Sequence, residues 1–132
     1  MSETHDAIRD QFETLHESYL AELPRRILRA REIWDRMSDD GWDSVAWHDL
    51  HRLIHGLAGS GAIYGFPMIS AAARALDVQL RAIVQDTRAP GKSQKQELAA
   101  LLDLIALAAH VAQHGGASLD LVDSSRAITP ET

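Results

Sequence analysis

Apolar residues recur at steps of three or four positions, or seven, from the beginning of the chain. This spacing is typical of one buried helical stripe and predicts a long helix over about residues 8–37. Pro24 falls inside it and predicts a kink or short break, because proline lacks an amide donor and clashes with the preceding turn. Since the stripe keeps its phase across Pro24, one bent helix is favoured over two antiparallel ones. The turn-forming residues 38–43 end it. The stripe comprises Ile8, Phe12, Leu15, Tyr19, Leu23, Ile27, Trp34 and Met37.

Two further helices follow. One spans about residues 44–61, with Asp43 or Ser44 as its N-cap. The next begins near Pro67, because proline is favoured in the first turn of a helix, and the turn-forming residues 87–92 end it. The predicted inner faces are Leu50, Leu53, Ile54 and Leu57 in the first of these, and Ile69, Ala73, Leu76, Leu80 and Ile83 in the second.

A fourth helix is predicted from its start signal. Ser93 and Gln96 have the spacing of a capping box, and Gly115–Gly116 stop the helix. Its inner face is Leu98, Leu101, Leu102, Ile105 and Val111. Residues 117–132 carry no apolar stripe, so we expect a flexible C-terminal tail there.

Helices of this length joined by short loops predict an all-α fold, an up-and-down antiparallel four-helix bundle formed by residues 1–116. No segment shows the alternation of a β-strand. We expect this single domain to be a monomer.

Composition narrows the classes of partner and compartment. The chain has 132 residues and a net charge of −6 with histidine neutral, which disfavours nucleic acid as a partner. No apolar run approaches the roughly 20 residues that cross a bilayer, and the polar N-terminus does not resemble a signal peptide. Cysteine is absent, which excludes disulfides and thiol chemistry. We expect a cytoplasmic protein that does not bind membranes.

The candidate chemistry lies in "LIHGLAGSGAIYGF", residues 53–66. Glycine costs about 1 kcal/mol relative to alanine inside a helix, so the small residues around His55 need an explanation. At 100° per residue, with Leu57 at the centre of the buried face, His55 lies about 160° away and faces solvent. The same count places His48, Arg52, Gly59 and Ala62 on that side, with Gly56 and Ala58 at the two edges of the buried face.

Two interpretations of the small residues remain open. Gly56, Ala58, Gly59 and Ala62 leave room for a second protein to bring a recessed active site onto the nucleophilic nitrogen of an exposed imidazole. Alternatively, the glycines permit close helix–helix contact or mark the helix end.

The motif "HGLAGS", followed by Gly65, resembles the histidine-containing phosphotransfer (HPt) domain. The family pattern is H-x-L-K-G-S, then an apolar stretch ending in glycine, then a helix with small residues and a closing acidic residue. His55, Leu57, Gly59, Ser60 and Gly65 fill its first part. "AAARALD", which ends at Asp77, resembles the second part, and the close match covers roughly residues 50–80.

The resemblance implies a carrier in a bacterial-type phosphorelay, without kinase or hydrolase activity of its own. His55 would accept a phosphoryl group through its outer ring nitrogen, and Gly59 would leave room for that group. Ser60 would orient the ring, bond to a neighbouring turn or simply belong to the helix end. The partners would be receiver domains of response regulators or a hybrid histidine kinase. No cofactor of its own is implied, since Mg²⁺ belongs to the receiver.

One residue departs from the family pattern. The usual lysine, three residues after the histidine, is Ala58 here. Arg52, one turn before His55, would partly replace its positive charge or would simply be a solvated surface residue. His48, His51, Arg52, Gly56, Ala58, Gly59, Ser60 and Ala62 are therefore expected to surround the phosphoryl group and the docking partner.

Two rival functions are weighed against this one. His51 and His55, at i and i+4, could chelate a metal, but no carboxylate falls clearly on their face, so we predict no metal site. His110 and His114 repeat the spacing, where the helix dipole accounts for them. The other rival is a helical adaptor, a degenerate HPt domain that binds a receiver or kinase without phosphotransfer.

Overall fold

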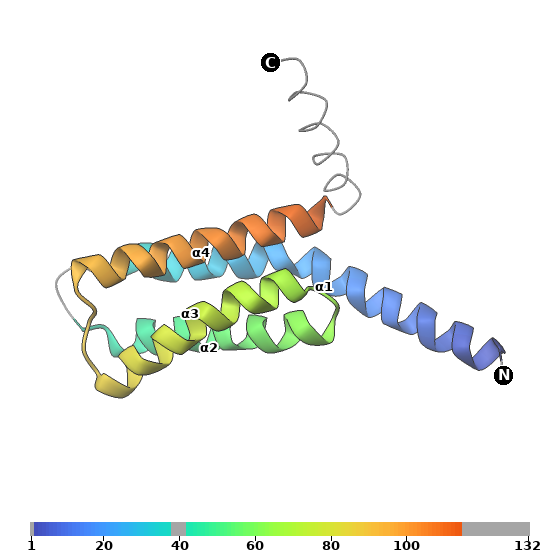
Figure 1. The fold of residues 1–132 in the computed structure, drawn as a ribbon, viewed down its shortest axis with the longest axis horizontal. Helices are drawn as coiled ribbons and strands as arrows, with labels where there is room; N and C mark the ends of the chain where they lie inside the picture. Colours follow the sequence, from blue (N-terminus) through green and yellow to red (C-terminus); the bar gives the residue numbers. More distant parts are fainter. Residues whose placement is uncertain (1, 38–41, 115–132) are drawn as a thin grey trace, which may run out of the picture.

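A computed structural model describes residues 2–37 and 42–114, and within these ranges the protein is all-α. Four helices follow one another: α1 (Ser2–Arg36), α2 (Ser44–Ile63), α3 (Pro67–Asp86) and α4 (Lys92–Gln113). Each packs against its neighbours in sequence, and α4 closes the bundle against α1 (Figure 1). The predicted four-helix bundle is therefore confirmed. The stop at Gly115–Gly116 and the tail 117–132 lie outside the described residues.

The core is built from aliphatic side chains of all four helices. Burial of each such side chain stabilises the fold by about 1.5–3 kcal/mol. None of the described helices combines the length and apolar character needed to cross a membrane. The largest fully buried side chains are Leu23, Ile33, Leu50, Ile54, Leu57, Ile69, Leu76, Leu80, Leu98, Leu102 and Ile105.

Helix α1 runs through Pro24 as one element, as predicted. Proline has no N–H, so the carbonyl of Leu20, four residues earlier, loses its helical partner. The side chain of Gln113, at the end of α4, donates a hydrogen bond from Nε2 to that carbonyl at 2.5 Å. The cost of the proline is thus partly offset by a bond between the first and last helices.

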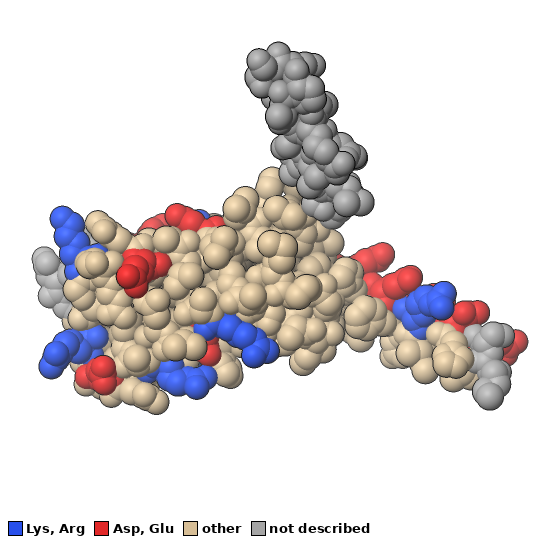
Figure 2. All heavy atoms as spheres, viewed as in Figure 1, with Lys and Arg blue, Asp and Glu red and all other residues tan. Residues whose placement is uncertain are grey.

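The first half of α1 is where the predicted stripe is wrong. Ile8, Phe12 and Leu15 are 61%, 47% and 46% exposed, because this part of α1 extends past the ends of the other helices (Figure 1). Most of the charged side chains along the same segment are acidic (Figure 2). From Tyr19 onward the residues of the stripe are buried or partly buried.

Of the three predicted helix starts, two are confirmed and one is wrong. Asp43 caps α2, since its Oδ1 accepts a hydrogen bond from the amide of Ala46 at 3.1 Å. Helix α3 begins at Pro67, as expected. The predicted capping box at Ser93 is wrong, because α4 already begins at Lys92 and extended Gly91 is its N-cap, without a side-chain cap bond.

The turn between α2 and α3 fixes their relative position. Gly65 has φ +89°, a conformation that side chains with a Cβ rarely adopt. A Cβ there would also lie 3.3 Å from Nδ1 of His16 on α1. That ring stacks on Phe66 with centroids 4.2 Å apart, so α1 supports the turn. α2 and α3 then lie antiparallel as the most extensive helix pair of the bundle.

Candidate functional site

His55 projects from α2 into solvent, with 64% of its side chain exposed. The angular count is correct for the residues around it on the outer face. His48, Arg52, His55, Gly56, Gly59 and Ala62 are all exposed. Their roles toward a partner stay predictions.

Ala58 is not part of that open surface, and the expectation that it clears the approach is wrong. It is only 6% exposed, because α3 covers its edge of α2. The buried hydroxyl of Ser70 donates a hydrogen bond to the carbonyl of Ala58 at 2.7 Å. A Cβ added to Gly61 would lie 3.1 Å from the backbone nitrogen of the same serine. Ala58 and Gly61 therefore permit close helix–helix contact.

Gly56 and Gly59 differ from that pair. Among the residues that the structure describes, a Cβ added at either position would meet nothing within 4 Å. No packing requirement of the bundle therefore explains these two glycines. The small residues of the motif thus serve two purposes: one set lets α3 approach, and the other leaves bare backbone beside His55.

The hydrogen bonds that the structure gives for Ser60 are to residues other than His55. The serine hydroxyl donates to the carbonyl of Gly56 at 2.7 Å and lies 2.9 Å from the hydroxyl of Tyr19 on α1. Since a serine hydroxyl carries one proton, the Tyr19 hydroxyl supplies the proton of the second bond. Ser60 therefore connects α2 to α1.

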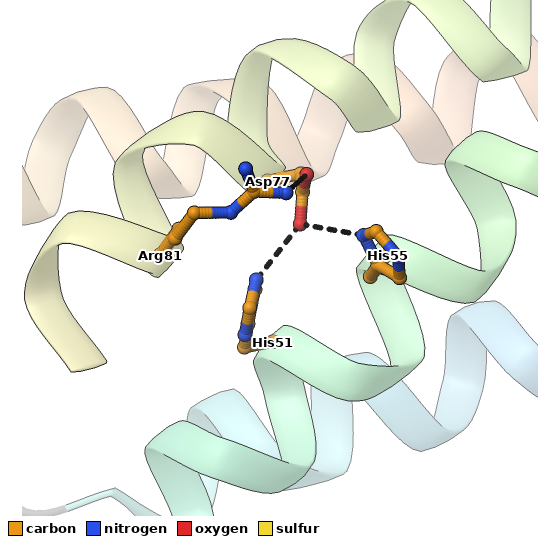
Figure 3. Close-up of polar contacts among 4 residues, drawn as sticks. All are labelled: His51, His55, Asp77 and Arg81. Atoms are coloured by element: carbon orange, nitrogen blue, oxygen red, sulfur yellow. Dashed lines mark hydrogen bonds and ion pairs between the residues drawn. The ribbon is translucent and has the colours of Figure 1, made fainter. Parts of the chain in front are cut away.

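A polar cluster lies where α2 faces the middle of α3 (Figure 3). Oδ1 of Asp77 lies 3.3 Å from Nδ1 of His55 and 2.9 Å from Nε2 of His51. The other oxygen, Oδ2, accepts a hydrogen bond from Arg81 at 3.2 Å. The side chain of Asp77 is 9% exposed and that of His51 is 22% exposed, so the cluster connects the buried helix interface to the exposed ring of His55.

Asp77 was not predicted to be a neighbour of His55, and the expectation that no carboxylate falls clearly on the face of His51 and His55 is wrong. One signal was available. Asp77 follows Leu76 and lies four residues after Ala73, so it belongs to the buried face of α3. A carboxylate on such a face requires a charged or hydrogen-bonding partner.

The cluster orients the imidazole of His55. With Nδ1 facing Asp77, the other ring nitrogen, Nε2, lies on the outer edge of the ring (Figure 3). The negative Oδ1 favours the tautomer with its proton on Nδ1, which leaves the lone pair on Nε2. The exposed nitrogen is thereby the nucleophilic one.

Positive charge near His55 comes from two helices. Arg81 on α3 binds the same carboxylate that faces His55, and Arg74 donates from Nε to Ser70 Oγ at 3.3 Å, beside the backbone of Ala58. Arg52 lies on α2, exposed to solvent. The arginines of α3 had no part in the sequence-based hypothesis, because it considered one helix at a time.

Comparison with known protein families shows that the model of the Hpt domain matches residues 14–114. The chain belongs to the Hpt-domain family. Hpt domains are histidine phosphotransfer modules of phosphorelays and interact with receiver or kinase partners. The Hpt match begins at residue 14, so most of the projecting segment of α1 lies before it. No curated protein and no solved structure matches the chain.

Proposed function

We propose that this protein carries a phosphoryl group on Nε2 of His55, between receiver-domain aspartates or from a histidine kinase to a response regulator. One observation carries the proposal. The exposed imidazole has one nitrogen facing a buried carboxylate, and the other points outward beside two glycines whose missing side chains leave open space. Family membership supports the same function.

The transfer step uses the ring as a nucleophile. The Nε2 lone pair attacks the phosphorus of an aspartyl phosphate on the receiver; an N–P bond forms, the acyl O–P bond breaks, and the aspartate leaves as a carboxylate. The imidazole becomes positively charged while Nδ1 keeps its proton. Oδ1 of Asp77, 3.3 Å from Nδ1, stabilises that charge.

Phosphoryl transfer depends mainly on positioning and on charge stabilisation. We assign Mg²⁺ to the partner receiver, so this chain acts as a carrier without a cofactor of its own. Arg81 and Arg74 on α3, together with Arg52, supply positive charge in the region where the family lysine is replaced by Ala58. The exposed residues of α2 form the docking surface: His48, Arg52, Gly56, Gly59 and Ala62.

The experiment is transfer from receiver domains phosphorylated with acetyl phosphate. The protein is incubated with a panel of these domains, and mass spectrometry under neutral conditions locates the phosphoryl group. We expect an acid-labile label on His55. A label confined to another histidine would contradict the proposal.

A second candidate function is an adaptor that binds a receiver or kinase without phosphotransfer. Ala58 favours it, because the family lysine is absent. The same panel separates the two functions: a stable complex that forms with a receiver and leaves His55 unlabelled identifies the adaptor.

A further inference from the structure

Three potential metal ligands converge at the polar cluster. Nε2 of His51, Nδ1 of His55 and Oδ1 of Asp77 all lie within 4.8 Å of one another. The histidines come from consecutive turns of α2 and the carboxylate from α3 (Figure 3). Two imidazoles and one carboxylate are a donor set that suits zinc.

An independent observation points to a ligand at the same place. Nε2 of His51 and Oδ1 of Asp77 are buried atoms and, within the described residues, neither has a hydrogen-bond partner. They lie 2.9 Å apart as an ion pair, but the geometry of that contact is not that of a hydrogen bond. A buried polar atom left in this state costs about 1–3 kcal/mol, and a bound ion is one way to remove that cost.

We propose that these three atoms bind a zinc ion, with water as the fourth ligand. Tetrahedral zinc with bonds of about 2.0–2.1 Å places its ligands about 3.3 Å apart. Oδ1 of Asp77 already lies 2.9 Å from Nε2 of His51 and 3.3 Å from Nδ1 of His55. Arg81 holds Oδ2 and leaves Oδ1 toward the ion, as an outer-shell residue does.

Zinc at this site changes the chemistry of His55, a consequence that rests on the proposed function. A neutral imidazole has one ring nitrogen with a lone pair and one with a proton. When zinc takes the lone pair of Nδ1, the proton moves to Nε2. The outward nitrogen then has no lone pair for phosphorus. The zinc-bound protein therefore does not accept a phosphoryl group on Nε2.

The test of the site is calorimetric titration of the untagged protein with zinc chloride. We expect one site, at least tenfold weaker in His51→Gln and in Asp77→Asn, because each variant lacks one ligand. His48→Gln, which removes an exposed histidine of α2 outside the cluster, should bind zinc like the wild type. Circular dichroism checks the fold of each variant, and magnesium chloride should give no binding.

Two results would overturn the site. One is the absence of stoichiometric zinc binding. The other is binding that persists in both His51→Gln and Asp77→Asn and is lost in His110→Gln, which would place the ion on α4. Nitrogen-15 NMR of the histidine rings adds a direct readout, since zinc should shift Nε2 of His51 and Nδ1 of His55.

The consequence is tested separately, by labelling His55 with and without zinc. We expect zinc to suppress labelling of the wild type at least tenfold more than that of His51→Gln, which also controls for zinc acting on the receiver. Zinc binding with equal suppression in the two proteins contradicts the switch. Absence of labelling in zinc-free protein contradicts the proposed function and leaves the calorimetric result standing.

Discussion

Two histidine pairs share the spacing i, i+4 and differ in everything around them. His51 and His55 lie in the middle of α2, with rings 6.0 Å apart, and Asp77 of α3 contacts both. His110 and His114 end α4, exposed, with rings 4.6 Å apart, and Nδ1 of His114 lies 3.0 Å from the carbonyl of His110. The i, i+4 spacing only places the two rings of each pair on the same face of their helix. A carboxylate on a neighbouring helix and bare backbone alongside distinguish the first pair.

The largest expected effect comes from removing one histidine of each pair. His55→Gln should lose all transferable label and stay folded, because its side chain is 64% exposed. His110→Gln should be labelled like the wild type. Mass spectrometry of the labelled proteins and circular dichroism measure both properties. Unfolding of His55→Gln would show that its assigned face is wrong.

The role of the open space beside His55 is tested by placing a large side chain in it. Gly59→Trp should keep His55 and slow transfer roughly a hundredfold, because a displaced partner loses the aligned geometry that transfer needs. The control is Gly91→Trp at the start of α4, where an added Cβ also meets nothing within 4 Å. The measurement compares the rates at which the two variants accept the phosphoryl group from one phosphorylated receiver. Undiminished transfer by Gly59→Trp would refute the access argument.

The carboxylate is tested by comparing two aspartates that each bind an arginine. Asp77→Asn should slow transfer about tenfold, or 1.4 kcal/mol in the barrier, since the ring loses the charge facing Nδ1. Oδ1 of Asp103 on α4 lies 2.6 Å from the guanidinium of Arg31 on α1, so this pair belongs to the two helices that do not form the cluster. Asp103→Asn should leave the rate unchanged. Equal rates for the two variants would remove Asp77 from the mechanism.

The smallest effect concerns stability and separates the two sets of small residues in α2. Gly56→Ala should raise the free energy of unfolding by about 0.5–1 kcal/mol, because an exposed helical glycine is replaced without a clash. Gly61→Ala should lower it by about 1 kcal/mol, since its Cβ would press on the backbone of Ser70. Urea denaturation measures both. Stabilisation by both substitutions would show that α2 and α3 separate at little cost.

Much of the fold was predictable because it depends on local signals. Apolar spacing located the four helices, and Asp43 and Pro67 marked two of their starts. The errors arise where local signals do not suffice. The stripe of α1 continues past the end of its partners, so Ile8 and Phe12 stay exposed. At Ser93, a valid capping pattern was superseded because α4 begins earlier, at Lys92.

The site, like the fold, was predictable only as far as signals within a single helix reach. Rotation about one helix places His55 outward but treats Gly56 and Ala58 as equivalent, since they lie about 100° to either side of Leu57. Only the position of α3 makes Ala58 buried and leaves Gly56 exposed. The approach of Asp77 to the histidines depends on the same packing.

The bond between Gln113 and the carbonyl of Leu20 has a consequence for assembly. Repeated apolar stripes allow two helices to slide past each other by one turn while still burying similar surface. Pro24 makes the Leu20 carbonyl distinct on α1, because its helical hydrogen bond is missing. A slide of α4 by one turn would separate that oxygen from the side-chain amide of Gln113. Pro24, which weakens its own helix, thereby favours a single axial alignment of α4 against α1.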